Sequence, residues 1–95
     1  MAAFIDELES IIQDRKQQPQ EGSYTTSLFE NGLDRILRKV GEESGELIIA
    51  AKNQDAVEVK EECADLIYHV LVMLAQQGIS FSEVEAVLKA RHAKK

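Results

Sequence analysis

The sequence is poor in several residue types that other kinds of protein depend on. Of its 95 residues none is tryptophan, one is cysteine (Cys63) and one is proline (Pro19). A single cysteine excludes an intrachain disulfide and suits a reducing compartment, so we expect a cytoplasmic protein in which Cys63 is a small buried apolar residue. A single proline leaves long stretches free to form helices, because proline disrupts helix interiors.

Long apolar runs and an excess of positive charge are also missing. No stretch approaches the roughly 18 apolar residues of a membrane span, and the opening MAAFIDELES has early acids instead of a signal peptide's apolar run. The net charge of −6 argues against nucleic-acid binding, which needs basic side chains to neutralise phosphates. We therefore expect neither a membrane nor a nucleic acid as a partner. A nucleotide substrate remains compatible, because a divalent cation can reverse the local charge.

Apolar residues recur at helical spacing and predict one all-α domain over residues 1–95. The first helix is predicted from about Ala2 to Gln17, followed by a loop in which Pro19 and Gly22 break the pattern. We expect this loop to continue through residues 23–26. A helical turn is predicted to restart near Ser27.

Two long helices and a shorter one follow. Asn31-Gly32 is expected to interrupt the chain before a helix over 33–52, and Asp55-x-x-Glu58 opens the next helix, which ends near Gln76. Ser80-x-x-Glu83 opens the last helix. Its apolar side chains are expected to point inward: Phe81, Val84, Val87 and Leu88. Short turns favour antiparallel neighbours, so we predict an antiparallel bundle of four to five helices.

The helix over 55–76 is apolar around most of its circumference. A helix of this kind must be covered on all sides. The other helices of a 95-residue chain offer limited cover, so we expect dimerisation to complete the bundle and the protein to be a homodimer.

Two acidic pairs have a spacing that suits one small cation. Glu43-x-x-Glu46 and Glu62-x-x-Asp65 each place two carboxylates on one helix face, with Cβ atoms about 5–6 Å apart. Carboxylate oxygens suit Mg²⁺ or Mn²⁺. Without a cation, two carboxylates about 5 Å apart repel by roughly 3 kcal/mol at an effective dielectric of ~20. The alternative interpretation is a solvated acidic face, since glutamate is a strong helix former.

Other side chains near the acids have two interpretations each. Arg35 and Lys39 lie on the same flank as Glu43 and Glu46, where they would bind phosphate or pair with neighbouring acids. His69 continues a polar stripe of the helix over 55–76 that consists of Glu58, Glu62 and Asp65. It is either a substrate contact or general base, or a hydrogen-bonded structural residue.

The runs SYTTSLFENGLDRILRKVGEESGELIIAAKN and EECADLIYHVLVMLAQQGIS make the sequence recognisable. Their two acidic pairs resemble those of the MazG-like all-α nucleotide pyrophosphohydrolase superfamily. The pieces SYT (23–25), KVGEE (39–43) and ADLIYH (64–69) are similar to the phosphoribosyl-ATP pyrophosphohydrolase family within it. The resemblance covers nearly the whole chain, including the closing L-x-x-R at 88–91, and holds at all acidic positions.

This resemblance implies Mg-dependent hydrolysis of phosphoribosyl-ATP to phosphoribosyl-AMP and pyrophosphate, the second step of histidine biosynthesis. It implies a stand-alone helical homodimer. The implied metal ligands for Mg²⁺ (or Mn²⁺) are Glu43, Glu46, Glu62 and Asp65.

Around such a metal, Glu42 and Glu61 are the candidates for the catalytic base or for a residue that holds a metal ligand in place. We expect Arg35 and Lys39 to hold outer phosphates. The expected contacts for the ribose-phosphate end are Ser23, Tyr24 and Thr25. Two alternatives stay open: a house-cleaning nucleoside triphosphate pyrophosphatase of the same superfamily, and a non-catalytic helical dimerisation module.

Overall fold

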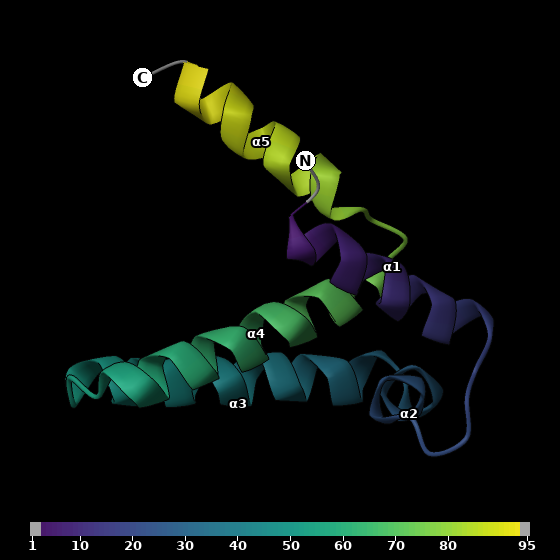
Figure 1. Ribbon diagram of the computed structural model, residues 1–95, viewed down its shortest axis with the longest axis horizontal. Coiled ribbons are helices and arrows are strands. Elements are labelled where there is room, and N and C mark those ends of the chain that lie inside the picture. Colours follow the sequence, from purple (N-terminus) through teal and green to yellow (C-terminus); the bar gives the residue numbers. More distant parts are fainter. Residues whose placement is uncertain (1–2, 94–95) are drawn as a thin grey trace.

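The computed structural model describes residues 3–93, which form five α-helices and no strand (Figure 1). The predicted all-α class is therefore confirmed. The helices are α1 (Phe4–Gln17), α2 (Tyr24–Asn31), α3 (Leu33–Lys52), α4 (Ala56–Gln76) and α5 (Phe81–Ala93). The predicted bounds of α3 hold at both ends. Ala2, the predicted start of α1, lies outside the described residues.

Helices α3 and α4 form a long antiparallel hairpin (Figure 1). The turn between them is short, and Gln54 takes a left-handed backbone conformation in it (φ 56°). Asp55 then caps α4, because its side chain accepts a hydrogen bond from the Glu58 amide at 3.2 Å. The hairpin therefore brings opposite ends of two helices side by side, and residues near position 43 lie across from residues near position 62.

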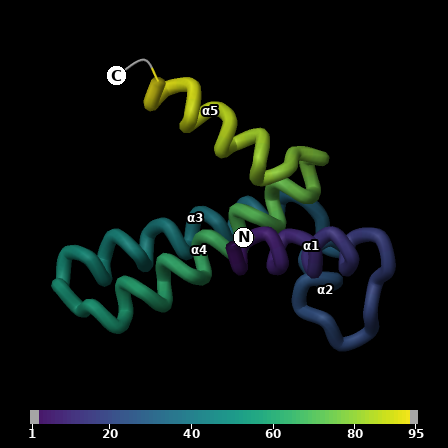
Figure 2. Tube along the Cα trace, turned by 45° about the horizontal axis from the view of Figure 1, so that its top comes forward, coloured from purple at the N-terminus to yellow at the C-terminus, as the bar shows by residue number. Residues whose placement is uncertain are grey.

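Helices α1 and α2 pack at the end of the hairpin where α3 begins and α4 ends (Figures 1 and 2). The buried core lies there, and its members come from α1, α2, α3 and α4: Ile12, Leu28, Ile36, Leu71, Val72 and Ala75. Lys16 of α1 closes this end by donating from Nζ to the Ala75 carbonyl at 2.7 Å. A lysine that bonds a carbonyl in the last turn of a helix also suits the negative end of its dipole.

Helix α2 is longer than the sequence pattern predicts. The loop was expected to run through Thr26, but α2 begins at Tyr24 because the Ser23 hydroxyl accepts a hydrogen bond from the Thr26 amide at 3.1 Å. This cap satisfies one of the free amides of the first turn. Gly32, with φ 92°, then separates α2 from α3 as expected, in a conformation that other residues adopt only with strain.

Helix α5 follows the predicted packing only in its first turn, where Phe81 and Val84 are half-buried and Phe81 packs against the core. Its capping box is present, since the Ser80 amide donates to Glu83 and the Glu83 amide donates to the Ser80 hydroxyl. Yet α5 leads away from the α3–α4 hairpin and buries none of its residues (Figures 1 and 2). Val87 and Leu88 are exposed, so their predicted inward orientation is wrong, because none of the described helices lies against that part of α5.

Helix α4 also keeps exposed apolar side chains, including Val57 in its first turn and Ile67 near its middle, whereas residues 68–76 are buried or half-buried. Cys63 is half-buried, less than predicted. Within residues 3–93, none of the helices combines the length and the apolar character that crossing a membrane requires.

Candidate active site

Three of the four predicted metal ligands converge between α3 and α4. Glu43 of α3 and Glu62 and Asp65 of α4 each offer a carboxylate oxygen, and these oxygens lie within 4.8 Å of one another. The antiparallel hairpin causes this convergence, because it places the middle of α3 against the middle of α4. Glu43 is buried, Glu62 is half-buried and Asp65 is exposed. The cluster therefore extends from the helix interface to solvent.

Glu46, the fourth predicted ligand, lies one turn beyond Glu43 on α3 and is exposed. It does not belong to the group of three oxygens, but its carboxylate lies next to that of Glu62. Together with burial and with Glu43, Glu46 raises the pKa of Glu62 to about 7. Carboxylates at this separation disfavour each other's charge, which raises the pKa of at least one of them.

The acids fit a divalent cation. Oε2 of Glu43 and Oε2 of Glu62 are buried, and neither has a hydrogen-bond partner among the described residues. A buried charged oxygen without a partner is costly. Oxygen-only donors, partly open to solvent, are what Mg²⁺ prefers, because this ion keeps several waters and also binds substrate phosphates.

A single lysine flanks the cluster on α3. Lys39 Nζ lies 3.4 Å from Glu43 Oε1 and 3.7 Å from Glu42 Oε2. Burial alone would lower the pKa of Lys39, but the bond to Glu43 and the nearby Tyr24 and Glu42 outweigh it and raise that pKa. Lys39 is therefore charged and held beside the cluster, with part of its side chain open to solvent.

The other predicted charged residues are exposed. Arg35 lies one turn before Lys39 on α3, and Glu61 lies next to Glu62 on α4. Neither forms an ion pair within the part of the chain that the structure describes. Glu42 differs from Glu61 in being held by Lys39.

A hydrogen-bonded group joins the start of α2 to the middle of α4. The Tyr24 hydroxyl lies 3.0 Å from His69 Nε2, and His69 Nδ1 lies 2.8 Å from the Asp65 carbonyl oxygen. The hydroxyls of Thr25 and Tyr68 also bond to each other. The Tyr24 ring stacks loosely on Tyr68, and both rings meet His69 edge-on.

Burial raises the pKa of Tyr68 even though the bond with Thr25 works in the other direction. His69 is 5% exposed, and both of its ring nitrogens have partners inside the protein. Its imidazole is therefore not free to act as a general base in this conformation.

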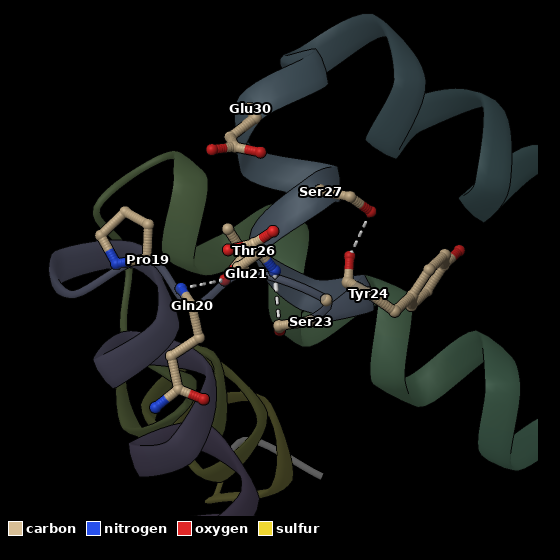
Figure 3. A pocket seen from close by; sticks show the side chains of 9 residues that line it. Pro19, Gln20, Glu21, Ser23, Tyr24, Thr26, Ser27 and Glu30 are labelled. Atoms are coloured by element: carbon tan, nitrogen blue, oxygen red, sulfur yellow. Dashed lines mark hydrogen bonds between the residues drawn. The ribbon is translucent and has the colours of Figure 1, made fainter.

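The described surface has a hollow at the start of α2 and another along the α3–α4 hairpin. The larger, about 700 Å³, lies over the segment from Pro19 to Glu30. Figure 3 shows the Tyr24 ring pointing away from the other side chains that line it. The Ser23 hydroxyl is already used as the cap of α2. The lining of this hollow contains none of the three converging acids, Glu43, Glu62 and Asp65. It includes Glu21 and Glu30, which would repel phosphate.

The smaller hollow, about 300 Å³, adjoins the acidic cluster. It is lined by Glu46, Ile49, Ala50, Asn53, Asp55, Glu58 and Glu62. Sequence reasoning placed Glu58 on the same stripe as Glu62 but did not identify Asn53 or Asp55 as parts of a site. Both residues lie in the short turn between α3 and α4. Their position in the sequence, between the two acidic pairs, is the signal that could have identified them.

Comparisons with known proteins agree with this architecture. A model of the family described as phosphoribosyl-ATP pyrophosphohydrolase matches residues 5–92. The phosphoribosyl-ATP pyrophosphatase of Streptococcus gordonii is 54% identical over 90 residues, which cover 92% of this chain and 86% of that protein. That of Clostridium botulinum is 54% identical over 87 residues, covering 92% and 79%.

A longer relative is also similar. The histidine biosynthesis bifunctional protein HisIE of Halalkalibacterium halodurans is 55% identical over 92 residues. The match covers 97% of this chain but 44% of that protein, so the chain spans less than half of this relative's length.

Proposed function

The chain belongs to the phosphoribosyl-ATP pyrophosphohydrolase family, and on this basis we propose that it hydrolyses phosphoribosyl-ATP to phosphoribosyl-AMP and pyrophosphate in histidine biosynthesis. The observation that carries the proposal is the group of Glu43, Glu62 and Asp65 oxygens within 4.8 Å of one another. Glu43 and Glu62 each have a buried oxygen that finds no hydrogen-bond partner in the part of the chain that the structure describes. A triphosphate that carries a divalent cation is a ligand that suits these three carboxylates.

We propose Mg²⁺, with Mn²⁺ as a substitute, as the cofactor, held by Glu43, Glu46, Glu62 and Asp65. When bound, the ion would neutralise phosphate oxygens and the charge that develops during transfer. Three of these residues are supported by the mutual approach of their oxygens. Glu46 is supported by its contact with Glu62, whose pKa it raises.

The residues around the acidic cluster would bind the phosphates and the phosphoribosyl end of the substrate. Lys39, held beside Glu43 by an ion pair, would bind outer phosphate oxygens, and exposed Arg35 would extend this cationic edge along α3. Tyr24 and Thr25, at the first turn of α2, would bind the phosphoribosyl end of the substrate. Ser23 would contribute indirectly, since its hydroxyl caps that turn.

Hydrolysis requires that a water oxygen attack one phosphorus of the phosphoanhydride bridge while that bridge breaks to give phosphoribosyl-AMP and pyrophosphate. A carboxylate would take the water proton. We propose Glu42 for this role ahead of Glu61, because Lys39 holds Glu42 at 3.7 Å on the same flank as Glu43. The test is the pH profile of kcat in Glu42→Gln and Glu61→Gln. If the fall in kcat at low pH disappeared in E61Q and persisted in E42Q, the assignment would be reversed.

We also propose a homodimer in the cytoplasm. Support for the dimer comes from the apolar side chains that residues 3–93 leave exposed, including Ile48, Val57 and Leu88, and from α5, which buries none of its residues. The single cysteine supports a reducing compartment. Multi-angle light scattering would give twice the chain mass for a dimer and the chain mass for a monomer.

The first experiment is pyrophosphate release from phosphoribosyl-ATP in Mg²⁺, compared with ATP, dCTP and dUTP, with an EDTA control. Release from phosphoribosyl-ATP alone, abolished by EDTA, is the expected result. Release from a deoxynucleotide instead would favour a house-cleaning pyrophosphatase. No release, with no Mg²⁺-dependent rise in Tm, would favour a helical dimerisation module.

A further inference from the structure

We propose that His69 is a positioning residue, which holds Tyr24 against α4 at Asp65 so that Tyr24 meets the substrate in one fixed orientation. The inference rests on the proposed function and goes beyond it, because it assigns His69 a role that acts through another side chain. It replaces the interpretation of His69 as a general base or direct substrate contact.

The hydrogen bond between the His69 ring and the backbone carbonyl of Asp65, one turn earlier in α4, determines which ring nitrogen of His69 carries the proton. A carbonyl oxygen accepts and never donates, so the 2.8 Å contact with the Asp65 carbonyl requires a proton on Nδ1. In the neutral ring, Nε2 is then an acceptor and receives the Tyr24 hydroxyl proton at 3.0 Å. The imidazole is 5% exposed, so water does not compete for either bond.

Tyr24 is the exposed member of the pair. It is 45% exposed although its hydroxyl is bonded, so its ring is available to a ligand while its orientation is held from inside the protein. Contacts with Tyr68 and His69 limit the ring's other movements. Because the Tyr24 hydroxyl donates to His69, its lone pairs are left to accept hydrogen bonds.

Tyr24 is also linked to the acidic cluster through hydrogen bonds. Its partner His69 donates to the Asp65 carbonyl, and the Asp65 carboxylate belongs to the cluster with Glu43 and Glu62. One chain of hydrogen bonds thus runs from Tyr24 through His69 to the backbone of Asp65. On the proposed function, α2 would therefore present Tyr24 to the same ligand that the acidic cluster binds.

The kinetic test uses the full chain and compares His69→Phe, His69→Gln, Tyr24→Phe and the double variant H69F/Y24F. A glutamine side chain places an amide oxygen where Nε2 lies, so H69Q keeps an acceptor for Tyr24 and H69F does not. At saturating Mg²⁺ we expect H69F and Y24F each to raise KM for phosphoribosyl-ATP by about five- to tenfold, the equivalent of one hydrogen bond, with little change in kcat.

H69Q is expected to stay within about twofold of wild type. The double variant should match the single ones, because both remove the same interaction. Ser27→Ala is the matched control, since it removes another hydrogen bond of α2, from Ser27 Oγ to the Tyr24 carbonyl, and leaves the pair intact. KM effects that multiply in the double variant, or an equal rise in S27A, would overturn the proposal. So would a loss confined to kcat with a raised Mg²⁺ requirement, which would place the effect on Asp65.

A spectroscopic readout separates this inference from the proposed function. The chain has two histidines, and the second, His92, is exposed on α5. A ¹⁵N-labelled sample therefore gives signals from two imidazole rings, and His92→Gln shows which of them belong to His69. We expect His69 to be a single Nδ1-protonated tautomer whose Nε2 signal shifts in Y24F. A protonated Nε2 in the neutral ring overturns the inference even if the enzyme is active. If the wild-type protein did not release pyrophosphate, the proposed function and the KM effects expected from it would be overturned. The ¹⁵N signals would still show which tautomer His69 adopts.

Discussion

Lys39 Nζ lies 3.4 Å from Glu43 Oε1, one turn further along α3, and Glu43 is 6% exposed. Oε2 of Glu43 has no hydrogen-bond partner within residues 3–93, so the ion pair with Lys39 compensates one of the two oxygens of this buried carboxylate. Lys39 therefore has a structural task without the cation in addition to its proposed contact with phosphate.

Lys39→Met is expected to lower the free energy of unfolding in EDTA by about 1–3 kcal/mol, because it leaves Glu43 without a counter-charge next to Glu62. Mg²⁺ should restore part of this loss, and the rise in Tm on adding Mg²⁺ should exceed that of wild type. Urea denaturation with and without Mg²⁺ measures both. Arg38→Met, an exposed neighbour, is the control, and an equal loss there would show a general charge effect.

Glu62→Gln is expected to abolish pyrophosphate release with little loss of helicity. The variant removes a charge from the group of converging oxygens but keeps the shape of the side chain. Activity and far-UV circular dichroism measure the two effects. Glu85→Gln, an exposed acid on α5, should behave like wild type. Full activity in purified E62Q would refute the metal assignment.

Stability without metal should depend on pH through Glu62. The pKa of this carboxyl is about 7 in the folded chain and 4.5 as the ordinary value, so the folded state binds more protons between these two pH values. The free energy of unfolding in EDTA should therefore fall as pH rises from about 4.5 to 7 through this group. E62Q should lose this contribution. A chemical-denaturation series across the window checks it, and an identical slope in E62Q would contradict it.

Mg²⁺ should stabilise the chain more at pH 8 than at pH 5. Cation binding requires deprotonated carboxylates, and protons compete with the cation for Glu62 below its pKa of about 7. The measurement is the change in Tm with Mg²⁺ at both pH values. A stabilisation that does not vary with pH would mean that Glu62 is not among the ligands.

Gly32→Ala is expected to destabilise the chain by about 1 kcal/mol or more, because φ is 92° and an added Cβ makes that conformation strained. A new Cβ meets no atom within 4 Å, so the cost is backbone strain alone. Gly45→Ala, in the interior of α3 with equally open space, should instead stabilise by about 0.5–1 kcal/mol. Thermal unfolding of both variants tests the contrast, and a loss of the same sign at both positions would contradict it.

Local signals in the sequence accounted for much of the secondary structure. Helical periodicity and the capping residues Asp55 and Ser80 predicted α3, α4 and the start of α5, because caps act through side chains three residues apart. The same kind of signal was overlooked at Ser23, and the start of α2 was therefore placed too late. The inward orientation predicted for Val87 and Leu88 of α5 was wrong for a different reason: the pattern shows that a face is apolar, not what covers it.

The sequence alone determined the helical class, the two acidic pairs and their spacing along each helix, since these depend on contacts within three or four residues. Only the tertiary structure decided which carboxylates meet. The antiparallel register of α3 on α4 brings Glu43 to Glu62 and Asp65 and leaves Glu46 at the edge. It also decided that His69 faces Tyr24, 45 residues away in the chain. Pairings of this kind follow from how whole helices bury their apolar faces, and no local pattern encodes them.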